Sequence, residues 1–439
     1  MSLAIVAAAI VALVVLVVWA KMHPFLAFIL VSAGAAAALG MPLGNIAGAV
    51  RKGIGDILGS LSIVIVAGAM LGKLVVDSGA AQRIAAVLVA AFGQRRMAWA
   101  MALTGFIVGI PLFYGVGFML LVPIIFAIVA RYNLPAVVVG VPALAAMSVA
   151  HGLLPPHPAP TALVATFNAN LGLTLFYGLV ISVPALILAG PVYSRFLAGI
   201  ASRPVASLAA KTLPDAELPG AGISMVTALL PAVLLLLTAV GAAVVPPESP
   251  WGKVVKFLSD PDVVMIFSLL FAAVSLGVLR GRPLPEVMST FSSALGDLGS
   301  ILLVIAGSGV FKEVLLQSGV NKEIGTLLQG LAVNPLILGW VLTAAIRVCV
   351  GSATVAGLTA AGILAPVVGA GGVDPNLMVL AIGAGSLFAS HVNDAAFWMF
   401  KEYFNVSLLE TFRCWTVMET IVSVVGLAGV LVLARLLPS

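Results

Sequence analysis

Long runs of apolar residues constrain this chain more than any other feature. They cover residues 3–20, 24–41, 57–76, 174–195, 222–246, 262–280, 297–316 and 411–435. A helix of about 20 apolar residues is long enough to cross the hydrocarbon core of a bilayer. Charged residues make up 8% of the chain, against about 25% in soluble domains. The sequence therefore predicts an all-α polytopic membrane protein.

The polar interruptions of these apolar runs return after an offset of 240 residues. His151 falls on His391 and Pro135 falls on Pro375, in segments that are otherwise almost entirely apolar. Such repetition is typical of membrane transporters built from two related halves. The predicted parts of the chain are a first repeat over 1–198, a cytoplasmic linker over 199–221 and a second repeat over 222–439.

Each half also contains two segments that do not have the pattern of a plain span. We interpret them as re-entrant helical hairpins at 97–131 and 335–370, and as discontinuous helices at 135–172 and 376–405. Their breaks are predicted at 109–117, 351–354, 151–160 and 390–394. Backbone freed from a helix at membrane depth must be buried in protein or line a watery cavity. On this reading each half crosses the membrane an odd number of times, so the second half is inverted relative to the first.

The distribution of Lys and Arg predicts an orientation. Placing the amino terminus on the far side of the membrane puts most of these residues into cytoplasmic loops, in agreement with the positive-inside rule. Both termini are then periplasmic. The run 3–20 has no basic segment ahead of it, so we expect it to be retained as a first helix.

Asp394 is the sharpest single signal of function. It follows Ser390, His391 and Asn393 in a polar cluster between apolar segments. An ionisable group at this depth is costly and usually marks a substrate or ion path. We predict Asp394 and His391 as the proton-coupling residues, with Glu419 as an alternative proton site. The competing interpretation of Asn393 or Asp394 is a cap on the following helix.

The predicted tip of the second hairpin has the composition of an anion site. Gly351, Ser352 and Thr354 combine a flexible backbone with two hydroxyls, and amides at a helix amino terminus hold carboxylates. Arg347 can bind an anionic substrate with a forked contact, or pair with a carboxylate such as Glu419. Small residues that only allow close helix packing are the alternative for the tip.

Further polar residues at the breaks complete the predicted substrate site. They are Ser390, Asn393, His151, His157 and Tyr114. Because His151 and His391 occupy equivalent positions of inverted halves, we expect them to face one cavity from opposite sides. A membrane histidine can also serve only as an interhelical hydrogen-bond partner, and His157, between prolines, as loop scaffolding.

Three segments resemble the gluconate permease family, the gluconate:proton symporters. They are VPALAAMSVAHGLLPPHPAPTA at 141–162, RVCVGSATVA at 347–356 and SHVNDAAFW at 390–398. The resemblance implies a bacterial inner-membrane importer of sugar acids driven by proton symport. It also implies kinship with the ion-transporter superfamily, and with it inverted repeats, paired re-entrant hairpins, a homodimer and an elevator-like motion. The family also takes idonate, fructuronate and D-serine-like substrates.

Several other functions lack support in the sequence. There is no phosphate-binding Gly-Lys-Ser/Thr loop and no metal-ligand spacing, and the basic residues are scattered. We therefore expect no cofactor, no metal and no nucleic acid, with the proton gradient as the driving force. A sodium-coupled carrier of another small organic anion is the alternative function, with Asn393, Asp394 and Ser352 as oxygen ligands of the sodium ion. An intramembrane enzyme is the remote alternative, since no nucleophile elbow is present.

Overall fold

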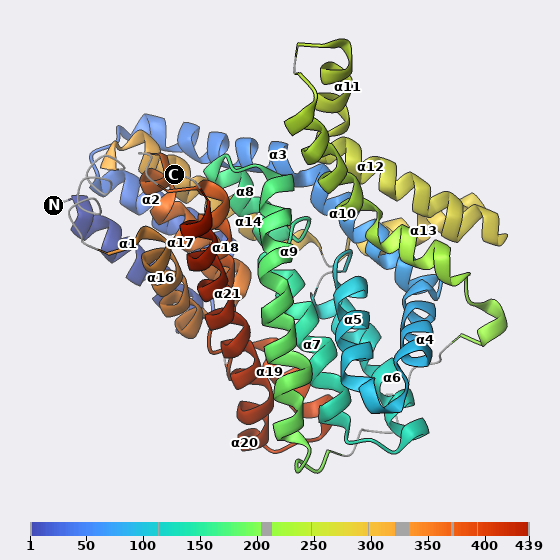
Figure 1. The fold of residues 1–439 in the computed structure, drawn as a ribbon. Helices are drawn as coiled ribbons and strands as arrows, with labels where there is room; N and C mark the ends of the chain where they lie inside the picture. Colours follow the sequence, from blue (N-terminus) through green and yellow to red (C-terminus); the bar gives the residue numbers. More distant parts are fainter. Residues whose placement is uncertain are drawn as a thin grey trace.

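The computed structural model describes residues 2–112, 114–202, 213–246, 248–296, 298–320, 333–369, 373–392 and 394–437. Throughout these ranges the chain forms helices and their connections, and no strand (Figure 1). The predicted all-helical fold class is confirmed. Residues 203–212 of the predicted linker 199–221 lie outside the described residues.

The helices follow one another in two similar series. Those of the first series are α1 (Ser2–Val18), α2 (Pro24–Ala38), α3 (Leu43–Asp77), α4 (Ala80–Phe92), α5 (Met97–Gly109), α6 (Tyr114–Tyr132), α7 (Ala136–Leu153), α8 (Pro158–Phe167), α9 (Leu171–Ile187) and η2 (Leu188–Val192). Those of the second are α10 (Ala221–Val244), α11 (Pro250–Leu258), α12 (Pro261–Ala272), η6 (Ala273–Gly277), α13 (Leu284–Ala294), α14 (Leu298–Gln317), α16 (Pro335–Val350), α17 (Ala353–Gly369), α18 (Pro375–Gly385), α19 (Ala395–Phe404), α20 (Leu408–Thr411), η8 (Phe412–Thr416) and α21 (Val417–Leu436).

Five helical stretches among the described residues are long and apolar enough to cross a membrane. They cover Ala136–Phe167, Leu171–Leu197, Ala221–Thr238, Pro261–Arg280 and Leu408–Leu436. Four of them contain or overlap apolar runs predicted from the sequence, and α2 is a shorter apolar helix. The chain therefore has the helices of a multi-pass membrane protein.

Helix α3 differs from the prediction of a span over 57–76. It begins at Leu43 and is bent by 47° between Ser60 and Ser62. Its first part carries polar residues that lower the hydropathy without breaking the helix. Lys52 and Asp56, one turn apart, pair at 2.8 Å and support the helical backbone there. A hydropathy pattern detects only the apolar second part.

Breaks between helices lie near the four positions predicted from the sequence. Helices α5 and α6 meet near Ile110, and α16 and α17 meet at Gly351, which has the left-handed φ of +81°. Helices α7 and α8 are separated by residues 154–157, and α18 and α19 by residues 386–394. The first of these breaks starts later than predicted, because His151 still belongs to the last turn of α7. The second starts earlier than predicted, because α18 ends at Gly385.

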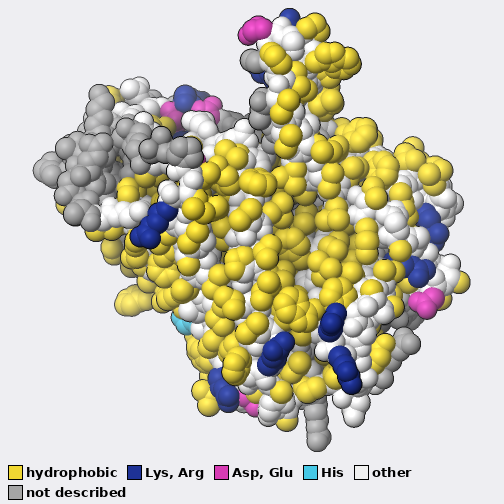
Figure 2. Space-filling view, in the orientation of Figure 1, with side chains coloured by type: hydrophobic (Ala, Val, Ile, Leu, Met, Phe, Trp, Pro, Cys, Tyr) yellow, Lys and Arg dark blue, Asp and Glu magenta, His cyan; other side chains and the backbone are white. Residues whose placement is uncertain are grey.

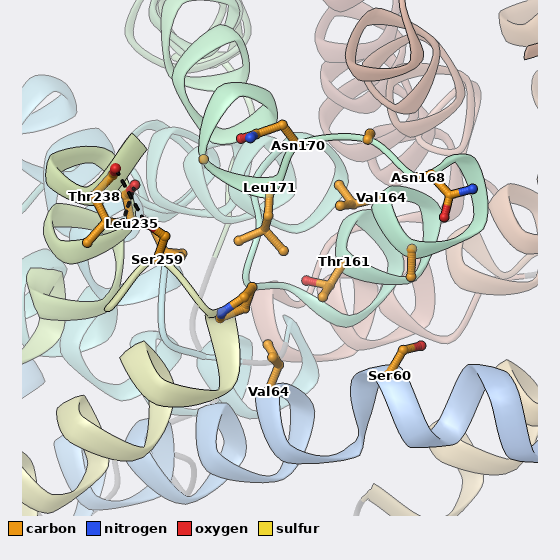
Figure 3. A pocket seen from close by; sticks show the side chains of 14 residues that line it. Ser60, Val64, Thr161, Val164, Asn168, Asn170, Leu171, Leu235, Thr238 and Ser259 are labelled. Atoms are coloured by element: carbon orange, nitrogen blue, oxygen red, sulfur yellow. Dashed lines mark hydrogen bonds between the residues drawn. The ribbon is translucent and has the colours of Figure 1, made fainter. Parts of the chain in front are cut away.

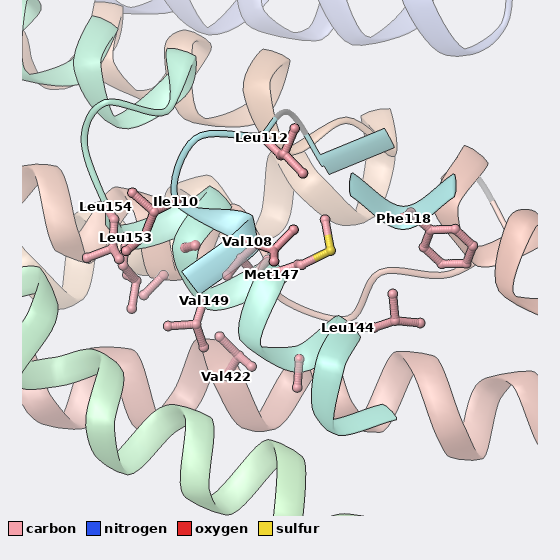
Figure 4. Close-up of a cluster of buried hydrophobic side chains, with 14 of the residues drawn as sticks. Val108, Ile110, Leu112, Phe118, Leu144, Met147, Val149, Leu153, Leu154 and Val422 are labelled. Atoms are coloured by element: carbon pink, nitrogen blue, oxygen red, sulfur yellow. The ribbon is translucent and has the colours of Figure 1, made fainter. Parts of the chain in front are cut away.

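Helix α7 is the buried centre of the first half. Its residues Leu144, Met147 and Val149 pack among side chains of α5, α6 and α21 (Figure 4). Burial of each large apolar side chain contributes about 1.5–3 kcal/mol. This packing holds α7 firmly, and the polar side chains of its last two turns are consequently well positioned.

Glycines allow the closest helix crossings. A Cβ atom on Gly53 of α3 would lie 2.6 Å from the carbonyl oxygen of Gly309 in α14. A Cβ atom on Gly383 of α18 would lie 2.1 Å from the carbonyl oxygen of Gly152 in α7. Only glycine permits backbones to approach this closely, as in many membrane helix pairs.

The surface has the distribution expected of a protein surrounded by lipid. Figure 2 shows a broad hydrophobic face over α9, α21 and α10, with Lys and Arg gathered toward the end that holds α19 and α20. Many large apolar side chains on these helices are exposed, among them Val183, Leu237 and Val432. Exposed apolar area of this extent is stable in hydrocarbon and not in water.

Candidate substrate-binding site

A cavity of about 430 Å³ lies where the breaks of both halves meet. It is lined by Tyr114, Gly115, Ser148, His151, Arg347, Val350, Gly351, Ser352, Ala353, Thr354, Leu387, Asp394, Ala395, Ala396, Met399, Trp415 and Glu419. Its volume falls within the roughly 300–1,000 Å³ of small-molecule sites. The predicted hairpin tip, Arg347 and Asp394 are brought together here, although 47 residues separate the two charged groups.

Arg347 and Asp394 form an ion pair at the edge of the cavity. The guanidinium Nη2 donates to Asp394 Oδ2, and Nη1 donates to the carbonyl oxygen of Gly351. Arg347 is 3% exposed, whereas the Asp394 side chain is 18% exposed. The arginine therefore joins the turn between α16 and α17 to the start of α19. Its partner is Asp394 and not Glu419, the carboxylate named from the sequence.

Asp394 also caps a helix, as the competing interpretation held. Its Oδ1 accepts a hydrogen bond from the Ala396 amide at 2.8 Å, at the first turn of α19. Its Oδ2 accepts from the Ser390 hydroxyl at 2.6 Å, and that hydroxyl in turn accepts from Trp415 Nε1 at 2.8 Å. Both oxygens of this carboxylate therefore accept hydrogen bonds, and these contacts fix its position.

Two helix amino termini point into the cavity. Ser352, Ala353 and Thr354 open α17, and Ala395 and Ala396 open α19. The first amides of a helix have no partner within the helix, and the helix dipole adds positive potential there. Together with the guanidinium of Arg347, these termini create a region that favours a carboxylate.

Aromatic rings also line the cavity. The ring centroid of Tyr114 lies 5.7 Å from that of His151 and 5.9 Å from that of Trp415. Tyr114 and His151 come from the first half and Trp415 from the second. Aromatic faces with polar edges suit a ligand that has both C–H surfaces and hydroxyls.

Several polar atoms of the cavity have no partner. Among the described residues, buried side-chain atoms without a hydrogen bond include Tyr114 Oη, His151 Nδ1, Arg347 Nε and Glu419 Oε2, and all four residues line this cavity. Buried polar groups are normally satisfied, so a cluster of unsatisfied ones indicates a place for a polar ligand or for water.

Sequence reasoning missed Ser148 and Trp415, and ranked Glu419 second. Ser148 lies three residues before His151 on α7, and its buried hydroxyl donates to Glu419 Oε1. Trp415 lies four residues before Glu419. This i, i+3 and i, i+4 spacing relative to a polar membrane residue was the available signal.

Other predicted residues lie outside the cavity. The ring of His391 does not line it, and His391 Nδ1 lies 3.0 Å from the Ala389 carbonyl oxygen. The expectation that both histidines face one cavity is wrong, because the chain leaves α18 at Gly385 and carries His391 away. His157 is buried with Nε2 2.8 Å from the Gly109 carbonyl oxygen, and its ring meets that of His151. Asn393 lies outside the described residues.

A second cavity, of about 480 Å³, lies between α3, α8, α9, α10 and the start of α12. In Figure 3, Ser60 and Val64 of α3 face Thr161 and Val164 of α8 across it. Its lining includes no charged side chain. Arg347, Asp394 and Glu419 line only the first of these two cavities, which is therefore the candidate anion site. Among the described residues, no cluster of His, Cys, Asp and Glu has the geometry of a metal site.

Residues 1–437 match the model of the GntP family permeases. The chain belongs to this family. It is 45% identical over 435 residues to the high-affinity gluconate transporter of Escherichia coli K12, covering 99% of both chains. It is 43% identical to the L-idonate transporter of the Gnt-II system of the same organism, over the full length of both. A gluconate permease of Bacillus subtilis is also 43% identical, with 99% coverage of each chain.

Membership of the GntP family confirms the resemblance identified from the three motifs. The members are permeases, so this chain is a transport protein, and the intramembrane-enzyme alternative is excluded. Two solved transporters share the fold at low identity. The YdaH transporter of Alcanivorax borkumensis aligns with a TM-score of 0.66 at 18% identity, over 94% of this chain and 98% of its own. MtrF of Neisseria gonorrhoeae aligns with a TM-score of 0.61 at 14% identity, over 96% of each chain.

Proposed function

We propose that this GntP-family permease imports gluconate or a closely related sugar acid across the bacterial cytoplasmic membrane together with protons. The observation that carries the proposal is the convergence of the Arg347 guanidinium and two helix amino termini on one cavity. This arrangement complements the carboxylate of a monoanionic substrate. The names of the relatives, gluconate and L-idonate transporters, support the same substrate class.

The remainder of the cavity matches a polyhydroxylated chain. Ser352 and Thr354 supply hydroxyls, and His151 and Tyr114 supply unpartnered polar atoms to the same cavity. A site built to hydrogen-bond hydroxyls discriminates strongly against analogues that lack them, because its own polar groups are then left unpaired. We infer that hydroxyl number and configuration decide the preferred sugar acid.

We also propose two inverted halves and an elevator-type motion. The contact pattern supports this proposal: α2 packs on α14 of the other half, and α12 packs on α3 in the corresponding way. Likewise α5 packs on α7, as α16 packs on α18. Pairs that correspond across the repeat are expected when two similar halves are related by an internal two-fold axis.

Uptake into proteoliposomes tests the proposed substrate and coupling. Labelled gluconate should accumulate when the interior is alkaline, and L-idonate should compete better than D-serine. The same uptake measured with and without sodium at fixed pH separates proton from sodium coupling. Dependence on sodium, or failure of every sugar acid to compete, would contradict the proposal.

Arg347→Lys tests the anion site. Lysine keeps the charge but loses the planar fork. Each lost hydrogen bond to a charged group contributes about 1.5–3 kcal/mol, so the KM for gluconate should rise roughly tenfold or more. Arg435→Lys, at the exposed end of α21, is the matched control and should leave KM unchanged. An unchanged KM in Arg347→Lys would show that the guanidinium does not bind substrate.

A further inference from the structure

Glu419 of α21 is a buried carboxyl without a cationic partner. It is 3% exposed and lines the substrate cavity. Its Oε1 accepts a hydrogen bond from the Ser148 hydroxyl, and its Oε2 has no partner. No Lys or Arg of the described residues forms an ion pair with it. A carboxylate in such a place is costly as an anion and much less so as a neutral acid.

The charged and titratable groups that face Glu419 do not relieve this cost. They are Tyr114 from α6, His151 from α7, Arg347 from α16 and Asp394 at the start of α19. Arg347 is the only permanent cation among them, and it is already bonded to Asp394 and to the Gly351 carbonyl. A bound monocarboxylate would add a third acidic group beside this single cation. Protonation of one acid lowers this excess of negative charge, and Glu419 is the acid with a free oxygen and no ion-pair partner among the described residues.

We propose that Glu419 carries the proton that is coupled to substrate entry. This inference rests on the proposed function, because it assigns the co-transported proton to one residue. Oε2 takes a proton from hydronium in the outer aqueous phase, which leaves water and the neutral acid, as the substrate carboxylate binds near Arg347. After the cavity opens inward, the O–H bond breaks, the proton passes to cytoplasmic water and the substrate leaves. One negative charge and one proton move together, so this pair crosses without net charge.

Ser148 acts as a positioning residue in this cycle. Its hydroxyl, on the rigidly packed α7, holds Oε1 and leaves Oε2 as the oxygen that exchanges the proton. Asp394, predicted from the sequence to carry the proton, is bound to Arg347, Ser390 and the Ala396 amide. These three contacts hold the Asp394 carboxyl beside the guanidinium. Asp394 therefore orients Arg347, and Glu419 exchanges the proton.

Glu419→Gln and Asp394→Asn, compared in proteoliposomes, test the assignment. Both substitutions replace one carboxyl group by an amide of nearly the same shape. With an imposed pH gradient, Glu419→Gln should fail to concentrate labelled gluconate, and the pH of the vesicle lumen should not follow uptake. Its gluconate counterflow, whatever its rate, should no longer vary with pH. Asp394→Asn should still concentrate gluconate, with a KM raised roughly tenfold or more because Arg347 loses its partner.

Glu419→Asp provides the conservative rescue. It keeps a titratable carboxyl and should restore gradient-driven accumulation with a displaced pH profile. Wild-type accumulation in Glu419→Gln, or loss of coupling in Asp394→Asn alone, would overturn the proposal.

Infrared difference spectra separate this inference from the substrate assignment. Between acid and alkaline pH, the purified wild-type protein should show a protonated-carboxyl band that Glu419→Gln lacks. If gluconate is not transported but this band is present, the substrate class is wrong and the proton site stands. If the band persists in Glu419→Gln, Glu419 is not the titrating group.

Discussion

At the scale of single residues, the two equivalent histidines have different surroundings. His151 lies in the last turn of α7 with Nδ1 unpartnered at the cavity, whereas His391 lies on the segment between α18 and α19 with Nδ1 near the Ala389 carbonyl. Corresponding positions in the predicted repeat therefore have different surroundings. Two predictions stay to be tested: that His391 couples protons and that His151 binds substrate. One pair of variants tests both.

We expect His151→Gln to raise the KM for gluconate and His391→Gln to leave it unchanged. A neutral hydrogen bond contributes about 0.5–1.5 kcal/mol, so the increase for His151→Gln should be roughly two- to tenfold. Glutamine does not titrate, so transport measured from pH 5 to 8 also reports on coupling. A flattened pH profile in His391→Gln would restore the sequence-based assignment, and an unchanged KM in His151→Gln would remove that residue from the site.

At the scale of helices, the crossing of α3 and α14 depends on backbone proximity. Gly53 and Gly309 face each other so closely that each would place a Cβ atom within 2.6 Å of the other residue's carbonyl oxygen. Gly55, two residues farther along α3, is exposed and would meet nothing within 4 Å. The same helix thus has one glycine where a larger side chain would clash and a second where it would not, which serves as a matched control.

Gly53→Ala should destabilise the protein and Gly55→Ala should not. Overpacking of a tight contact typically costs about 1–3 kcal/mol. Alanine at an open helical position instead stabilises by up to about 1 kcal/mol relative to glycine. Thermal unfolding in detergent, followed by the yield of monodisperse protein, measures the stability of both variants. Equal melting temperatures for the two variants would contradict the close contact between the backbones of α3 and α14.

At the scale of the whole molecule, the uncharged cavity of Figure 3 lies between two groups of helices. On one side is α3, which packs with α2, α12, α13 and α14, and on the other is α8, which packs with α17 and α18. Lys312 of α14 donates to the Thr166 carbonyl of α8 at 3.0 Å, a contact between the two groups. An elevator-type motion would displace α8 along α3 and reshape this cavity.

Cross-linking Ser60→Cys to Ala165→Cys should therefore arrest transport. Both positions line the cavity, on α3 and α8 respectively. The native Cys349, which is exposed, and Cys414 are replaced by Ala in the background. A reducible bifunctional thiol reagent should abolish gluconate uptake, and reduction should restore it, while each single-cysteine variant stays active. Undiminished uptake by cross-linked protein would show that α3 and α8 do not move relative to each other.

The predicted homodimer and the periplasmic placement of both termini also belong to this scale. They follow from the family resemblance and from the distribution of Lys and Arg, and they stay predictions. Labelling of terminal cysteines by a membrane-impermeant reagent in intact cells measures the placement directly.

The sequence by itself determined the helical class, the series of apolar elements and most of the polar residues of the cavity. These depend on local quantities: the hydropathy of about 20 consecutive residues and the free-energy penalty of a polar group at membrane depth. For that reason Arg347, Asp394, His151 and the turn at Gly351 could be selected without coordinates.

Only the tertiary structure decided how these groups are paired. Arg347 bonds to Asp394 and not to Glu419, and Glu419 is left with Ser148. His151 lines the cavity and His391 does not, and the early part of α3 is helical despite its charges. Each outcome depends on distances of a few ångströms between residues far apart in the chain. Electrostatic and hydrogen-bond energies fall steeply over such distances, so residue type and spacing do not determine them.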